Sequence, residues 1–248
     1  MYRILYTEFL KIKKAKILLL IPISSLIPVL LMLLIYISET GESMRAAGWE
    51  NYLGHLLVTL SDLTPPVFIL FTGFIFSREY SDNTMDCMIT YPISRVGILV
   101  SKMLVMVPVV LLVMFLSFAS GLILGKFLIY DSLSMAVFVE YAKIYLTISV
   151  LQLALVPVAA TVSIISKNII ASAVAALAEF LLLIAFLNTK YNVFYPWGVP
   201  ALFSSKWGKY LEQGNFNVSN ALITLTVTFV LALLTNVIYY RKTELIAK

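Results

Sequence analysis

Long apolar runs separated by short polar stretches make up most of the chain. Four of these runs contain no acidic or basic residue: 17–37, 103–125, 144–166 and 218–240. Two further runs contain one acid each: 57–76 with Asp62 and 169–187 with Glu179. A helix of about 20 mostly apolar residues crosses a bilayer. The pattern therefore predicts an all-α polytopic membrane protein with six transmembrane helices, forming a single domain over residues 1–248.

Residues 1–16 have a different, amphipathic pattern. Apolar side chains recur at helical spacing, at Tyr2, Leu5, Phe9 and Ile12. Polar or basic side chains recur between them, at Arg3, Thr7, Lys11 and Lys14. This pattern is typical of a helix that lies along the membrane surface. We expect its basic face to point toward the anionic headgroups of the cytoplasmic leaflet.

The distribution of basic residues predicts how the chain is oriented. With six spans, both termini lie on the same side of the membrane. Twelve of the 18 Lys and Arg residues fall on that side and six on the other. Because cytoplasmic loops are enriched in Lys and Arg, we predict that both termini are cytoplasmic. Residues 77–102 then form the large cytoplasmic loop, and residues 188–217 form the longest external loop.

The composition agrees with a membrane protein and excludes an ordinary soluble domain. Hydrophobic residues make up 61% of the chain and charged residues 12%, about half the charged share of a soluble protein. The net charge of +5 follows from the cytoplasmic excess of basic residues, so we expect no nucleic-acid partner. Cys87 is the only cysteine, so no disulfide can form within the chain.

Residues suited to catalysis or metal binding are scarce. His55 is the only histidine, which rules out a metal site that needs two. The glycines at 121 and 125 have the wrong spacing for an ATP-binding P-loop, which also needs a Ser or Thr where Phe127 stands. Ser117, Gly121 and Gly125 instead form a stripe of small residues that favours close helix packing. We therefore predict no catalytic residue and no bound metal or cofactor on this chain.

Glu179 lies near the middle of the fifth predicted span, where an ionisable group is expensive and often functional. It shares a helical face with Ser172 and Ala176. Small residues lie beside this face, at Ala171, Ala175 and Ala178, and favour tight packing against another helix, in the same or a second subunit. Glu179 is either a neutral or hydrogen-bonded carboxyl that joins helices or a group that lines a substrate path.

A polar face also runs along the second predicted span. His55, Thr59 and Asp62 follow i, i+4, i+7 spacing and share this face. Pro65 and Pro66 come next and remove two backbone donors, so we expect the helix to kink or open locally. The three polar residues are candidates for the outer part of a substrate path or for a polar cluster at the membrane interface.

The predicted cytoplasmic loop has space for a helix of about three turns over residues 79–90. One face of this helix would be acidic, with Glu79, Asp82 and Asp86, and another would be apolar, with Met85, Met88 and Ile89. Exposed methionines favour contact with another protein over simple solvation. We therefore interpret the loop as a docking element for a separate cytoplasmic protein.

Aromatic residues gather in the predicted external loop: Tyr191, Phe194, Tyr195, Trp197, Trp207, Tyr210 and Phe216. Such side chains favour the headgroup zone of the bilayer. Tyr195, Trp197 and Trp207 are candidates for a cap over the transport pathway, and an aromatic belt that anchors the fold would give the same pattern.

These features resemble the type-2 ABC exporter permeases. The similarity rests on residues at that family's spacing after the second span: Glu79, Thr84, Pro92, Ser94, Arg95 and Lys102. It also rests on the N-terminal helix, the six spans and the long loop before the last span, so it covers the whole chain. Asn83 replaces the glycine that usually precedes the threonine, and we expect the turn to survive because Asn tolerates left-handed backbone. Segment 8–16 is further similar to permeases of the lantibiotic-immunity and bacitracin-resistance type.

This resemblance implies a transport subunit and not an enzyme. ATP and Mg would be bound by separate cytoplasmic ABC ATPase subunits, and two permeases, identical or related, would form a pathway within membrane lipid. The residues that the resemblance assigns to ATPase coupling are Glu79, Asp82, Thr84, Met85, Asp86, Pro92, Ser94 and Arg95. The narrower similarity implies export of a hydrophobic or amphipathic antimicrobial peptide from the bacterial cytoplasmic membrane, giving bacteriocin immunity or antibiotic resistance.

Two other functions fit the same sequence. An ion-coupled secondary transporter would use Asp62 and Glu179 as proton sites. A non-transporting bacteriocin immunity protein would sequester the peptide without an ATPase. A nucleotide-binding partner held through the 77–102 loop distinguishes the exporter from both.

Overall fold

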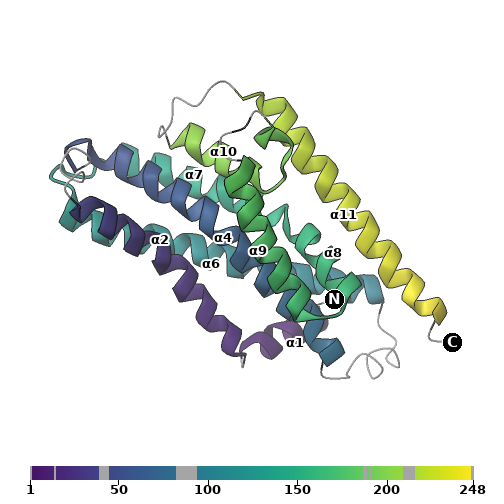
Figure 1. Ribbon diagram of the computed structural model, residues 1–248. Coiled ribbons are helices and arrows are strands. Elements are labelled where there is room, and N and C mark those ends of the chain that lie inside the picture. Colours follow the sequence, from purple (N-terminus) through teal and green to yellow (C-terminus); the bar gives the residue numbers. More distant parts are fainter. Residues whose placement is uncertain are drawn as a thin grey trace.

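The computed structural model describes residues 2–13, 15–38, 45–81, 94–186, 189, 191–208 and 216–246 (Figure 1). All the secondary structure in these ranges is helical, which confirms the predicted all-α fold. The helices are α1 (Tyr2–Lys13), η1 (Lys16–Leu19), α2 (Leu20–Ile37), α4 (Gly48–Ser81), α6 (Arg95–Leu128), α7 (Met135–Leu153), α8 (Val156–Ser166), α9 (Ile169–Phe186), η2 (Asn192–Phe194), α10 (Gly198–Trp207) and α11 (Val218–Ile246).

The described residues contain six helical segments long and apolar enough to cross a membrane, which confirms the predicted number of spans. Helices η1 and α2 make the first span, and α7 and α8 together make the fourth. Helices are the expected solution because hydrocarbon offers no partner for a backbone N–H or C=O group. Helix α10 was not predicted from the sequence, since it is short and has no long apolar run.

Both chain termini lie at the same end of the bundle, as an even number of spans requires (Figure 1). This end, called the terminal end below, also carries α1, the end of α4 and the start of α6. The opposite end, called the far end, carries α10 and the start of α4. The assignment of the terminal end to the cytoplasm remains a prediction from the charge bias.

Helix α4 is the centre of the bundle, in contact with α2, α6, α8, α9 and α10. Its packing against α6 uses the predicted small-residue stripe. A methyl group added at Gly121 would come within 2.2 Å of Leu56, and one added at Gly125 within 2.5 Å of Trp49. Tyr52, fully buried, donates from its hydroxyl to the backbone oxygen of Gly121 over 2.9 Å. The stripe is therefore a close helix contact within one chain.

Helix α4 also passes through Pro65 and Pro66 without interruption, so the expected local opening of the helix is not observed. Pro65 has no N–H to bond the carbonyl of Ser61. The amide of Gln152 on α7 lies 3.5 Å from that carbonyl and donates to it instead. A side chain from a neighbouring helix thus satisfies a backbone group that proline leaves free.

The fourth span breaks between α7 and α8, at Ala154 and Leu155. Pro157 follows in the first turn of α8, where proline is well tolerated. Its carbonyl accepts hydrogen bonds from Thr161, at 2.9 Å, and from the amide of Asn236 on α11, also at 2.9 Å. The break therefore gives the peripheral helix α11 a specific polar attachment to the bundle.

Helix α1 confirms the predicted N-terminal helix but not its predicted faces. Ile12 and Glu8 are buried against the bundle, whereas Phe9 is 40% exposed. The packing face therefore combines part of the apolar stripe, Leu5 and Ile12, with the acidic Glu8, and leaves Phe9 out. Lys11, assigned to a basic face toward headgroups, bonds instead to two acids of this chain.

Candidate functional site

Four charged side chains meet at the terminal end of the bundle, beside the predicted cytoplasmic loop. Glu8 and Lys11 come from α1, Glu79 from the last turn of α4, and Lys102 from the second turn of α6. The spacing of three residues puts Glu8 and Lys11 on one face of α1. We call these four residues the charge tetrad.

Four short ion pairs connect the members of the tetrad in a ring. Lys11 Nζ lies 2.6 Å from Glu8 Oε1 and 2.9 Å from Glu79 Oε1. Lys102 Nζ lies 2.9 Å from Glu79 Oε1 and 3.3 Å from Glu8 Oε2. Each acid therefore contacts both bases, and the four charges sum to zero.

The tetrad is buried to a degree unusual for charged residues. The side chains of Lys102, Glu8 and Glu79 are 1%, 3% and 5% exposed, respectively. A buried ion carries a large desolvation penalty, so these groups persist only because each has a partner. The third proton of Lys102 is also used, since Nζ donates to the carbonyl of Ile75 over 3.0 Å.

Further contacts tie α1 to the end of α4. The guanidinium of Arg78 donates to the carbonyl of Lys11 at the end of α1, over 2.9 Å. The same guanidinium lies 5.8 Å from the centre of the Phe74 ring, close enough for a cation–π contact. Arg78 therefore also caps the C-terminal end of α1, where a cation is favourable.

Lys11 is the most accessible member of the tetrad, at 39% side-chain exposure. Burial alone would lower its pKa. The hydrogen bond to Glu8 and the charge of Glu79 outweigh that effect and raise the pKa of Lys11 above 10.5. A base with a raised pKa adds stability that is complete below 10.5 and is lost as pH rises through the higher value. Lys11 therefore carries its positive charge at neutral pH.

Glu79 was predicted to lie on an exposed acidic face, and this is wrong. Its side chain is buried, because it compensates the charges of Lys102 and Lys11 inside the protein. Glu8 was missed as a partner, although its position one turn before Lys11 was a usable signal.

Of the other residues predicted to couple to the ATPase, the structure describes only Ser94 and Arg95, which follow the loop. Asp82, Thr84, Met85, Asp86 and Pro92 lie outside the described residues, so their predicted role is untested. Ser94 ends this gap and is the N-cap of α6, where its hydroxyl accepts from the N–H of Gly97 over 3.2 Å. Arg95 is the first residue of α6.

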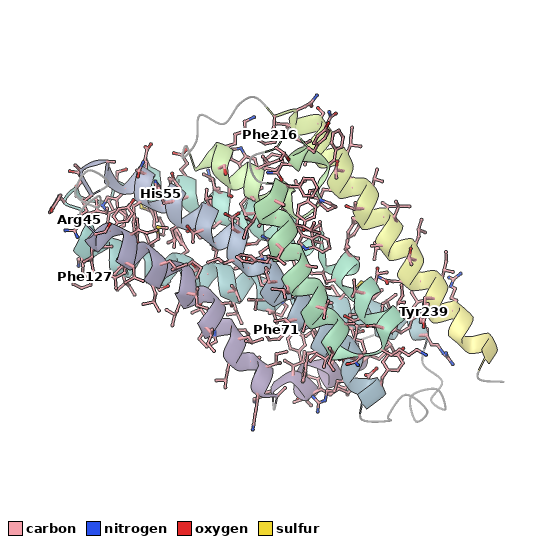
Figure 2. All side chains as sticks on the ribbon, in the orientation of Figure 1. Arg45, His55, Phe71, Phe127, Phe216 and Tyr239 are labelled. Carbon is pink, nitrogen blue, oxygen red and sulfur yellow. The ribbon has the colours of Figure 1, made fainter. Side chains whose placement is uncertain are left out.

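The structure gives the predicted substrate-path residues different neighbours. His55 lies toward the far end of α4 (Figure 2) and packs edge-on against the ring of Tyr36, with ring centres 6.2 Å apart. The hydroxyl of Thr59 donates to the carbonyl of His55 over 2.9 Å. Asp62 instead interacts electrostatically with Glu179 on α9. Asp62 and Glu179 therefore belong together, and His55 belongs to a separate aromatic cluster.

The predicted aromatic cap is also divided. Tyr195 stacks on Phe186 of α9, with ring centres 5.5 Å apart, and donates from its hydroxyl to the carbonyl of Glu179 over 3.1 Å. Trp197 packs partly buried against Ala176 and its neighbours, whereas Trp207 lies against Phe203 within α10. Tyr195 and Trp197 thus brace α9 from within the chain.

The small-residue face of α9 packs inside the subunit. Ser172 is fully buried against Gly73 of α4, and its hydroxyl lies 2.8 Å from that of Ser163 on α8. Ala178 is exposed on a different side of the helix. An interface with a second subunit along α9 would therefore use Ala178 and not the Ser172 face.

No group of three or more His, Cys, Asp or Glu side chains that could hold a metal ion occurs in the part of the chain that the structure describes. The tetrad has only two carboxylates, and both are already bonded to ammonium groups. Its arrangement suits the mechanical joining of three helices.

Comparison with known proteins gives two findings. The family described as "ABC-2 family transporter protein" matches residues 4–188, more than half of the chain. The chain is also similar to the bacitracin transport permease protein BCRB of Bacillus licheniformis. The two are 23% identical over 180 residues, which is 73% of this chain and 85% of that protein. The family match over residues 4–188 includes all four tetrad residues.

Removing one charge from the tetrad should destabilise the protein. Lys102→Met leaves the buried acids with one base, and we expect a loss of about 3–5 kcal/mol, the usual cost of breaking a buried pair. The double variant Glu79→Gln/Lys102→Met restores neutrality and should recover part of this loss. Unfolding of the purified chain in detergent measures both, with Lys143→Met, an exposed lysine on α7, as the control. Equal stability of Lys102→Met and Lys143→Met would contradict the role of the tetrad.

Proposed function

The chain belongs to the ABC-2 family of transporter proteins and is a multi-pass permease of the cytoplasmic membrane, and from this we propose that it is the membrane subunit of an ATP-driven exporter of antimicrobial peptides. ABC-2 permeases work with ATPase subunits, so the chain is a transport subunit and not itself an enzyme. The sequence contains no P-loop, which agrees with ATP and Mg binding on the partner.

The observation that carries this proposal is the charge tetrad. It joins α1 to α4 and α6, the two helices that flank residues 82–93. A partner that moves this loop would therefore move three helices together. Each of α4 and α6 has 34 residues, about 50 Å at 1.5 Å per residue. Displacement at the terminal end would thus reach the far end of the bundle.

The proposed substrate is a hydrophobic or amphipathic peptide taken directly from the bilayer. The protein named for bacitracin transport supports this substrate class, and the narrow similarity of segment 8–16 points the same way. Helices α2, α9 and α11 carry extensive exposed apolar surface. Such surface accommodates a lipid-embedded substrate better than a hydrated pore would.

The proposed unit contains two permease subunits, identical or related, with the pathway between them. Only 22% of the residues in the membrane-spanning part of α9 are buried within the chain, and the share is the same for α11. A single bundle therefore leaves much of these helices available to lipid or to a second subunit. Ion coupling through Asp62 and Glu179, and immunity without transport, are the competing functions that the experiments below separate.

The ATPase partner should depend on the acids of the 82–93 segment. We expect Asp82→Lys/Asp86→Lys to reduce co-purified ATPase at least several-fold, because a complementary basic surface would be repelled. Glu79 is left intact, since its reversal would break the tetrad. Vanadate-sensitive phosphate release from tagged, purified permease gives the readout, and Glu140→Lys at the far end is the matched control. Normal ATPase recovery in the double variant would refute docking through these acids.

Expression of the permease with its ATPase should raise the inhibitory concentration of bacitracin or a lantibiotic at least several-fold. A hydrolysis-dead ATPase should abolish this protection, because extraction of a peptide from the bilayer requires energy. Protection that survives the dead ATPase would favour a sequestering immunity protein. Protection that instead collapses with a protonophore at normal ATP levels would favour ion coupling.

Cysteine crosslinking should identify whether α9 borders the second subunit. In a Cys87→Ser background, we expect Ala178→Cys to crosslink between subunits, since Ala178 is exposed. Ala176→Cys should not, because Ala176 is 3% exposed inside the bundle. Crosslinking at neither position, with activity retained, would move the interface to another helix. A strictly monomeric active complex would rule out the dimer.

A further inference from the structure

A second set of acids, separate from the charge tetrad, lies uncompensated between α4 and α9, with Glu179 buried and Asp62 half-buried. Glu179 is 3% exposed, and within the described residues neither of its carboxylate oxygens has a hydrogen-bond partner. The same is true of Asp62 Oδ1 on α4. Gly73 of α4 lies against Ser172 of α9, so the face of α9 that carries Glu179 packs on α4, and the charge of Asp62 acts on Glu179 across this contact. Three carboxyl oxygens thus have no hydrogen-bond partner among the described residues.

Within the described residues, the helices that pack around the two acids place no positive charge beside them. Helix α9 holds no other ionisable residue, and α8, which packs against it, holds none. On α4 the other titratable groups between Glu50 and Arg78 are Tyr52, whose hydroxyl bonds to the carbonyl of Gly121, and His55, which is two turns away beside Tyr36. From the segment after α9, the hydroxyl of Tyr195 is used by the backbone carbonyl of Glu179.

Two further polar groups close to Asp62 also lack their usual hydrogen-bond partner. Pro66 has no N–H, so the carbonyl of Asp62 lacks its usual helical partner. The hydroxyl of Ser61, fully buried next to Asp62, has no partner among the described residues, so it donates to neither carboxyl group. Two ionised carboxylates here would repel each other and stay unsolvated, which a membrane interior penalises strongly.

A proton resolves this arrangement more simply than a metal ion. One carboxylic O–H can donate to the other carboxyl, which removes a charge and satisfies two of the unpartnered oxygens. A metal ion that prefers oxygen needs about six ligands, whereas only two carboxyl groups are present. We propose that Asp62 and Glu179 form a proton-binding carboxyl pair that fastens α9 to α4 when it is protonated.

With this pair, the packing of α9 on α4 would depend on whether the proton is bound. Helix α9 packs mainly on α4, the helix that also carries Glu79 of the tetrad (Figure 1). Loss of the shared proton would place two negative charges across that contact. Movement of α9 would then depend on the local proton concentration, independently of whether a peptide or ATP is bound.

The test uses the full chain, purified in detergent without an ATPase, so its result does not depend on the proposed export function. Melting temperature is measured from pH 5 to pH 10 for the wild type, Asp62→Asn, Glu179→Gln and the double variant. The unfolded chain releases its carboxyl protons at about pH 4, the ordinary pKa of a carboxyl group, whereas the folded pair still holds one at neutral pH. Stability of the wild type should therefore fall as pH rises from about 5, and level off once the folded pair has lost its proton. Each variant should flatten this fall, and Glu140→Gln, an exposed carboxyl on α7, should not.

Infrared spectroscopy gives an independent readout that does not rely on unfolding. A protonated carboxyl band should be present in the wild type at pH 7 and absent from the double variant. Identical melting profiles for the wild type and the double variant, with no such band, would overturn the proposal. Rescue of the wild type at high pH by Na⁺ or K⁺, absent in the double variant, would also overturn it in favour of a cation site. If Glu179→Gln does not fold, Asp62→Asn alone gives the same comparison.

Discussion

The surrounding lipid cannot satisfy a polar group, so each polar side chain or free carbonyl must find its partner within the protein. This constraint explains the most specific contacts of the fold. The amide of Gln152 donates to the carbonyl of Ser61, which Pro65 leaves without its helical partner. The amide of Asn236 donates to the carbonyl of Pro157 itself. Such bonds attach α7 to α4 and α11 to α8. Apolar packing alone would let these helices slide, because lipid tails are as apolar as leucine.

The charge tetrad is the strongest case of the same constraint. Its two acids and two bases come from three helices, so none can leave without stranding a buried charge. Helix α1 is thereby fixed to the flanks of the segment that the ATPase is proposed to engage. Asp62 and Glu179 are the exception, since they lack bases, and that exception is what points to a bound proton.

The sequence by itself determined the class of the protein and the course of its chain. Six apolar runs of sufficient length are enough to predict six helices, because the energy of bilayer insertion depends on local composition. The close helix contact at Gly121 and Gly125 could also be predicted from the sequence, since small residues at helical spacing allow two helix backbones to approach. Residues Glu79 and Lys102 were singled out through a family resemblance, but their physical contact was not predicted.

Tertiary structure alone decided which polar groups meet. Glu8 and Lys102 are separated by 94 positions along the chain, and nothing in either local pattern shows that they form an ion pair. Glu79 looked like an exposed acid because helical periodicity describes a face without describing what covers it. Helix α1 covers Glu79, and burial turned an expected docking residue into a structural charge. The pairing of Asp62 with Glu179 has the same origin, since only the packing of α9 on α4 brings them together.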